Sequence, residues 1–206
     1  MCSKSCLHGV GLPKSLKIGR NGPRSECNLR LLYIYDNSNN VERQPLVFVP
    51  EDGLDETGTI NVSYDPLTDF YLEADLESNQ VSDGTWCVDS ETVIFQNSSD
   101  YYQILNPCED NIEDIVGEER YNNHYADIDW HIISYIINNY NVDDDIVCPV
   151  SGDTHTITTN SIQFAIWSFT NPGEYTCPVD GIDEDIECDS GCAIVNEVKQ
   201  VFWISE

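Results

Sequence analysis

The sequence predicts an α+β protein, and a change in the apolar pattern along the chain leads to this class. Short segments rich in β-branched and aromatic residues, typical of strands, continue to residue 105. The apolar spacing then becomes three and four residues, as in helices, over residues 125–140 and 160–169. The last apolar run, residues 193–205, is expected to be a strand. A helical pair inserted between strands that return to one sheet gives an α+β architecture.

The first 80 residues are expected to form a small β-rich unit, a sandwich-like meander. Polar residues 36–40 supply a turn between two of its strands. Residues 59–64 alternate apolar and polar side chains, which is typical of a half-buried strand. The strands expected in this unit are residues 29–35, 45–49, 59–64 and 69–76.

Residues 81–206 are expected to form a second, α+β domain. Its first helix is apolar around more than half of its girth, so it should be buried on two sides. Its second helix can be capped by one of residues 158–160, and Asn171-Pro172-Gly173 ends it. The elements expected in this domain are strands at residues 93–95, 101–105 and 193–205 and helices at residues 125–140 and 160–169.

The charge of the chain is strongly acidic and unevenly distributed. The formal net charge of the 206 residues is -28. Residues 1–43 hold seven of the nine basic residues, which leaves two basic and 34 acidic residues in the remainder. Such an acidic body repels nucleic acid and anionic membranes and favours cationic partners. We therefore expect no nucleic-acid binding.

Nine cysteines in a chain of this length indicate an oxidising compartment. No signal segment or membrane-spanning run is evident, so we expect no membrane insertion and an extracellular or cell-surface piece of a longer protein. The odd number of cysteines leaves one outside any intramolecular disulfide framework.

Two short motifs carry the candidate chemistry. Cys87 stands beside Trp86 at the start of an expected strand-like run. Gln163 lies in the first turn of the helix at 160–169, one position from the centre of the apolar stripe. A glutamine in this position is ordinarily a surface residue. Gln163 is of interest because the chain also has a cysteine, Cys87, in a strand-like run far upstream.

Together with Ala165, Ile166 and Trp167, this pair resembles the Cys–Gln internal thioester domain (TQxA-type) of bacterial surface adhesins, over about residues 80–206. The family often has threonine before the glutamine, where this chain has Ile162. The resemblance implies a thioester between Cys87 and the side-chain carbonyl of Gln163.

The resemblance also implies a β scaffold and a helical subdomain bridged by the thioester. Such a domain is a covalent adhesion module and not a turnover enzyme, because its bond is consumed. It would acylate an amine or hydroxyl nucleophile of a partner, either a surface protein or a small amine. It needs no cofactor or metal.

Formation of a thioester from a carboxamide requires orientation and a dry, polarising site. Trp86 and Trp167, one beside each partner, are suited to excluding water. His131 and His155 are the candidate proton carriers, although an exposed structural histidine is the commoner case.

Structural explanations compete with each of these assignments. Cys87 could form an ordinary disulfide and Gln163 could lie outside, in a non-catalytic, disulfide-rich acidic module. If Cys87 is instead in a thioester, eight cysteines remain for four disulfides. We then expect disulfides to Cys177 or Cys148 to hold Cys188 and Cys192 near the end of the Gln163 helix.

Disulfides are favoured over zinc at Cys188 and Cys192. The acidic runs at residues 143–145 and 183–185 are expected to be solvated loops rather than calcium sites.

Overall fold

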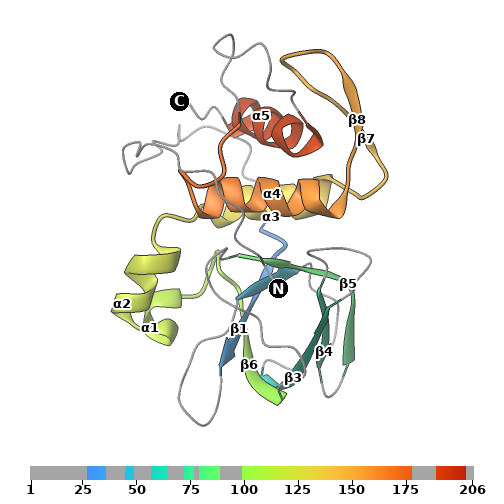
Figure 1. Cartoon of the computed structure of the whole chain (residues 1–206). Coiled ribbons are helices and arrows are strands. Elements are labelled where there is room, and N and C mark those ends of the chain that lie inside the picture. The colour runs from blue at the N-terminus through green and yellow to red at the C-terminus, as the bar shows by residue number, and fades with distance from the viewer. Residues whose placement is uncertain are drawn as a thin grey trace.

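The computed structural model describes residues 27–35, 45–48, 57–64, 72–76, 79–88, 99–177 and 189–202. The predicted α+β class is confirmed: antiparallel strands occupy one part of the molecule and three longer helices lie across one end of them (Figure 1). The strand predicted at residues 93–95 and the acidic run at 183–185 lie outside the described residues.

Six strands pair with one another, and every pairing is antiparallel. Their order is β1-β2-β5-β4-β3-β6, and β6 also pairs with β1, so the hydrogen-bonded order closes on itself. The strands predicted at residues 29–35, 45–49, 59–64, 69–76 and 101–105 are confirmed. The division predicted between residues 80 and 81 falls within one strand, β5. The bounds are β1 (Arg30–Tyr35), β2 (Leu46–Phe48), β3 (Thr57–Tyr64), β4 (Leu72–Leu76), β5 (Asn79–Cys87) and β6 (Ser99–Leu105).

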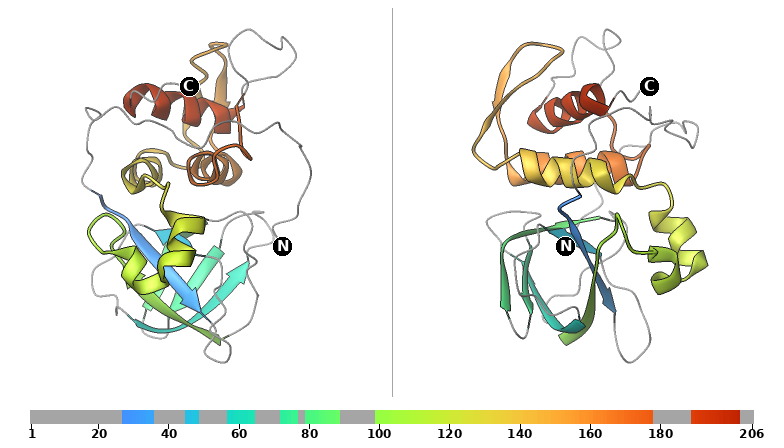
Figure 2. Two further views of the ribbon diagram at one scale, coloured as in Figure 1. Left: turned by 90° about the vertical axis from the view of Figure 1, so that its left-hand side faces the viewer. Right: turned by 180° about the vertical axis from the view of Figure 1, so that it is seen from behind.

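The segment after β6 forms short helical turns beside the sheet (Figure 2). These are α1 (Ile112–Val116), α2 (Glu118–Arg120) and the π-helical turn η1 (Tyr121–Tyr125). The helix predicted at residues 125–140 begins only at Trp130 and forms α3 (Trp130–Asn139). Asp129 sets this start, because its extended backbone and its side chain, which accepts from the His131 N–H, cap the helix.

The helix predicted at residues 160–169 is confirmed as α4 (Thr159–Thr170). Thr158 caps it: its side chain accepts from the backbone N–H of Ser161, and the Ser161 hydroxyl accepts from the N–H of Thr158. Between α3 and α4, β7 (Asp145–Val147) and β8 (Thr154–Thr156) form a two-stranded hairpin.

The strand predicted at residues 193–205 is wrong, because this segment forms helix α5 (Ser190–Phe202). Its β-branched and aromatic residues suit a strand, but Ile194, Val195, Val198 and Phe202 recur at helical spacing and are all buried. Gly191 allows close packing on α4, since a Cβ at this position would meet the Phe164 ring at 2.8 Å.

The three long helices bury a common apolar core above the end of the strands. Helix α4 lies in the middle layer, with contacts to β5, α3 and α5. Helix α4 therefore joins the strands to the helical layer.

No helix within the described ranges is both long and apolar enough to cross a membrane.

Disulfides tie this arrangement at several points. Cys27 is bonded to Cys108, and Cys177 to Cys192. The predicted link of Cys192 to the end of the Gln163 helix through Cys177 is thus confirmed. Cys148 is also disulfide-bonded.

Candidate functional site

The side chain of Gln163 is completely buried and faces the backbone of Cys87. The exposed fraction of Gln163 is 0%. Its side-chain oxygen accepts a hydrogen bond from the Cys87 N–H at 2.8 Å, and its Nε2 donates to the Cys87 carbonyl at 2.7 Å. The common surface role of a glutamine at this helix position therefore does not apply here.

The pairing of β5 explains why the Cys87 backbone is available to a side chain. On one edge of β5, Leu46 of β2 lies opposite Cys87, and the neighbouring Val88 N–H donates to the Pro45 carbonyl. In an antiparallel ladder the polar groups of successive residues point to alternate edges, so those of Cys87 point to the other edge. On that edge β4 begins at Leu72, opposite Thr85. The Gln163 carboxamide takes the position that a peptide group of a neighbouring strand would have.

The Cys87 thiol is buried, with 1% of the residue exposed. Among the described cysteines, Cys87 alone is outside a disulfide. It lies at the end of β5, whereas the sequence suggested the start of a strand. The thiol thus belongs to the same residue whose backbone holds the carboxamide.

A second contact holds α4 to the end of β5. The Thr170 hydroxyl donates to the Val88 carbonyl at 2.7 Å, and Asn171 Nδ2 donates to the same oxygen at 3.2 Å. Asn171 Nδ2 also donates to the Thr170 hydroxyl at 2.8 Å. These residues were missed by the sequence reasoning. Their spacing of seven and eight from Gln163, which places them on the same helix face, was the available signal.

The residues predicted to accompany the glutamine lie in the core and in an aromatic group on α4. Ala165 and Ile166 are fully buried. Trp167 is 5% exposed, and its ring centroid lies 5.1 Å from that of Tyr175. Tyr175 in turn makes an edge contact with Phe164.

Trp86 is partly buried against the core. Neighbouring side chains of a strand point to opposite faces, so Trp86 and Cys87 face different sides of β5. Trp86 therefore does not lie on the same side of β5 as the Cys87 thiol, and shielding by Trp167 stays a prediction.

The two candidate proton carriers lie on other elements. His131 is in the first turn of α3, beside the Cys27–Cys108 disulfide. His155 is on β8, opposite Ile146 of β7. Neither binds the Gln163 carboxamide, both of whose described partners are in Cys87. Their role in proton transfer stays a prediction.

Comparison with family models, with curated proteins and with solved structures finds no match to this chain.

Proposed function

We propose that this chain is an extracellular covalent binding module in which Cys87 and Gln163 form an internal thioester. One observation carries the proposal: both polar atoms of a fully buried glutamine carboxamide are held by the backbone of a buried cysteine that is present as a thiol. The resemblance to adhesin thioester domains rests on the same two residues, which are 76 positions apart.

The hydrogen bonds of the carboxamide are those that thioester formation would use. As the Cys87 sulfur attacks the carboxamide carbon, negative charge develops on the oxygen that accepts from the Cys87 N–H. The new S–C bond replaces the C–N bond, the thiol proton passes to the leaving nitrogen, and ammonia departs. The Cys87 carbonyl orients that nitrogen. Orientation of this kind can contribute about 7–11 kcal/mol to lowering a barrier.

The burial of the pair suits a bond that must survive until a partner arrives. Cys87 and Gln163 are at most 1% exposed, so water has little access to the acyl carbon. An amine or hydroxyl of a partner would then attack this carbon, the C–S bond would break, and the Cys87 thiol would be released. The bond is consumed once, so the module does not turn over.

The class of partner follows from the chemistry and charge. A thioester acylates amines and hydroxyls, whether on a surface protein or on a small amine. The net charge of -28 attracts cationic molecules, so positively charged amines should reach the site more readily than neutral hydroxyl compounds.

The finer architecture belongs to the same proposal: a sandwich- or barrel-like scaffold that carries an inserted helical subdomain, with the thioester as the bridge. The closed order of strand pairing and the position of α4 on the end of β5 support it.

A specific observation also favours the alternative, a non-catalytic, disulfide-rich acidic module. The Gln163 carboxamide completes the edge of β5, and this contact stabilises the fold without any reaction. The two functions differ in covalent chemistry, so a mass measurement separates them.

The test is the intact mass of the folded, non-reduced chain, followed by treatment with methylamine. A thioester lowers the mass by one ammonia beyond the disulfide hydrogens; methylamine then adds its own mass at Gln163 and releases a thiol at Cys87. Cys87→Ala and Gln163→Glu should abolish both effects, whereas Gln103→Glu, a control on β6, should change neither. If the wild-type chain keeps its ammonia, gives no adduct and retains an intact carboxamide at position 163 in a peptide map, the thioester is refuted.

A further inference from the structure

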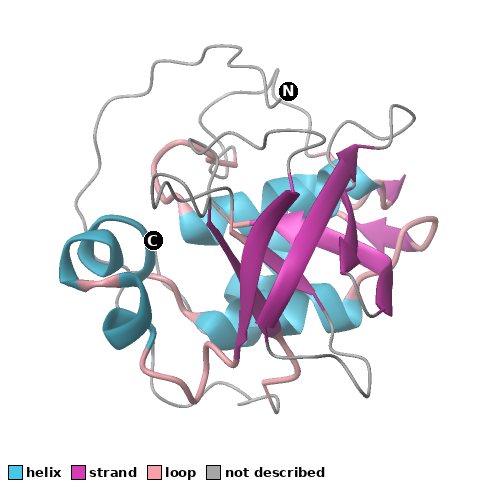
Figure 3. Cartoon of the chain, turned by 90° about the horizontal axis from the view of Figure 1, so that it is seen from below, coloured by secondary structure: helices cyan, strands magenta, loops and turns pink. Residues whose placement is uncertain are grey.

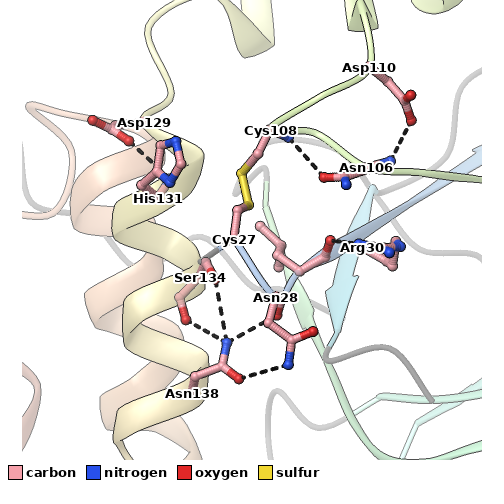
Figure 4. The surroundings of a disulfide bond; sticks show 11 residues. Cys27, Asn28, Arg30, Asn106, Cys108, Asp110, Asp129, His131, Ser134 and Asn138 are labelled. Atoms are coloured by element: carbon pink, nitrogen blue, oxygen red, sulfur yellow. Dashed lines mark hydrogen bonds between the residues drawn. A yellow bond between two sulfur atoms is a disulfide. The ribbon is translucent and has the colours of Figure 1, made fainter. Parts of the chain in front are cut away.

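A cluster of three metal-ligating side chains lies beside the first turn of α3. Cys27 precedes β1, Cys108 follows β6, and His131 is in the first turn of α3 (Figure 4). One ligand atom from each of the three lies within 4.8 Å of the others. All three residues are half-buried, so small molecules in solution can approach them.

Hydrogen bonds independent of the disulfide hold Cys27 near α3. Asn138 of α3 donates to the carbonyl of Asn28 at 3.0 Å, and the Asn28 side chain donates back to Asn138 Oδ1 at 3.4 Å. Asn138 also donates to the Ser134 carbonyl at 2.8 Å, within the same helix. Figure 4 shows this group directly below the sulfur atoms. These hydrogen bonds, which do not involve the sulfur atoms, tie the backbone next to Cys27 to α3.

Cys108 is positioned by its own turn. Its N–H donates to the Asn106 side chain at 3.3 Å, and the Asn106 N–H donates to the Asp110 carboxylate at 2.6 Å. The first turn of α3 is fixed in the same way, since the His131 N–H donates to Asp129 at 3.0 Å. Hydrogen bonds thus hold the backbone at or next to each of the three residues.

The imidazole of His131 has an unused polar atom. Its Nδ1 is buried and has no hydrogen-bond partner within the described part of the chain. A buried polar atom without a partner destabilises the fold. A metal ion coordinated by Nδ1 would supply the missing partner.

We propose that the reduced form of this cluster binds a zinc-class divalent cation through Cys27, Cys108 and His131. A dithiol reductant supplies two electrons and two protons to the S–S bond and gives two thiols. The cation then displaces both thiol protons and accepts a lone pair from the neutral imidazole. Two thiolates and one imidazole are a set that Zn²⁺ prefers, and water takes the fourth tetrahedral position.

The geometry needs little rearrangement. Zinc binds sulfur at about 2.3 Å and imidazole nitrogen at about 2.0–2.1 Å. Ligand atoms within 4.8 Å of one another can reach a common ion with side-chain adjustments alone, and the Cα atoms of the two cysteines are 6.2 Å apart. The disulfide and the metal exclude each other, yet each ties β1 and β6 together at this end of the sheet. The metal adds a bond to α3.

The test uses the full chain carrying Cys87→Ala, so that the thiol of the proposed thioester does not contribute. After reduction by a phosphine and removal of the reductant, Zn²⁺ is added and each thiol is followed by alkylation and peptide mapping. We expect zinc to slow alkylation of Cys27 and Cys108 but not of Cys177 and Cys192. Co²⁺ in place of zinc should give the visible bands of a tetrahedral site at one ion per chain.

His131→Asn and His124→Asn are the matched pair of variants. Loss of even an indirect partner of a zinc ligand weakens binding by about 10–100-fold, so His131→Asn should weaken zinc binding at least that much. His124, which is exposed on η1, should have no effect when changed. Equal alkylation with and without zinc, or equal protection in the His131→Asn chain, overturns the proposal. Loss of the tetrahedral signal through unfolding of the reduced chain overturns it too, because the site requires the fold.

Discussion

The contact between Gln163 and the Cys87 backbone predicts that replacing the Gln163 side chain removes both hydrogen bonds, whereas replacing the Cys87 side chain removes neither. In the Cys87→Ala chain both hydrogen bonds remain, because they involve only the backbone of residue 87. Adding Gln163→Met keeps the length of the side chain but leaves a buried N–H and a buried carbonyl without partners. Each unsatisfied group costs about 1–3 kcal/mol, so the second substitution should lower the free energy of unfolding by about 2–6 kcal/mol.

The measurement is urea unfolding of the Cys87→Ala chain with and without Gln163→Met. The midpoint should fall while the denaturant slope stays the same, because the surface exposed on unfolding is unchanged. Asn160→Met, on the exposed face of the same helix, is the control and should change stability by no more than about 0.5 kcal/mol. A loss for Gln163→Met as small as that of the control would show that the carboxamide does not complete the edge of β5.

Three further predictions concern the elements around the site. Thr170→Val removes the 2.7 Å hydrogen bond to the Val88 carbonyl and should cost about 0.5–1.5 kcal/mol in urea unfolding; an unchanged midpoint would contradict the contact. Gly191→Ala places a Cβ 2.8 Å from the Phe164 ring and should cost about 1–3 kcal/mol, and a double-mutant cycle with Phe164→Leu should recover part of this loss. Burial, and secondarily the nearby negative charge of Glu197, raises the pKa of Tyr140 far above its ordinary value. Because the folded state disfavours ionisation of Tyr140, its contribution to the free energy of unfolding is present below about pH 10 and is lost as the pH rises further. Tyr140→Phe should reduce this loss. An unchanged pH profile of the free energy of unfolding would count against the burial of this hydroxyl.

Local patterns predicted many of the elements. Alternation and β-branched residues located β1, β2, β3, β4 and β6 within a few residues, whereas β5 was missed apart from a strand-like run around Cys87. Helix α4 was predicted because its capping residue, its apolar face and its stop signal all agree. Helix α5 was not, since its valines, isoleucine and aromatic residue suit a strand as well as a helix. Packing of Gly191 against Phe164 and the Cys177–Cys192 disulfide accompany its helical form.

The candidate site shows the same limit. The sequence alone singled out Cys87 and Gln163 through short motifs, and it correctly placed one on a strand and the other on a helix. It did not predict the anchor at Thr170 or the neighbours of His131, because these contacts join residues that are far apart along the chain.

The sequence by itself determined the α+β class, most of the strands, helix α4 and the acidic, cysteine-rich character of the protein, because each of these depends on composition or on the period of neighbouring side chains. Only the tertiary structure decided that Gln163 is buried and that its carboxamide binds the Cys87 backbone. The physical reason is that hydrogen-bonding groups on one edge of β5 accept whichever partner the fold brings there. That partner comes from a helix 76 positions away, and no local pattern specifies it.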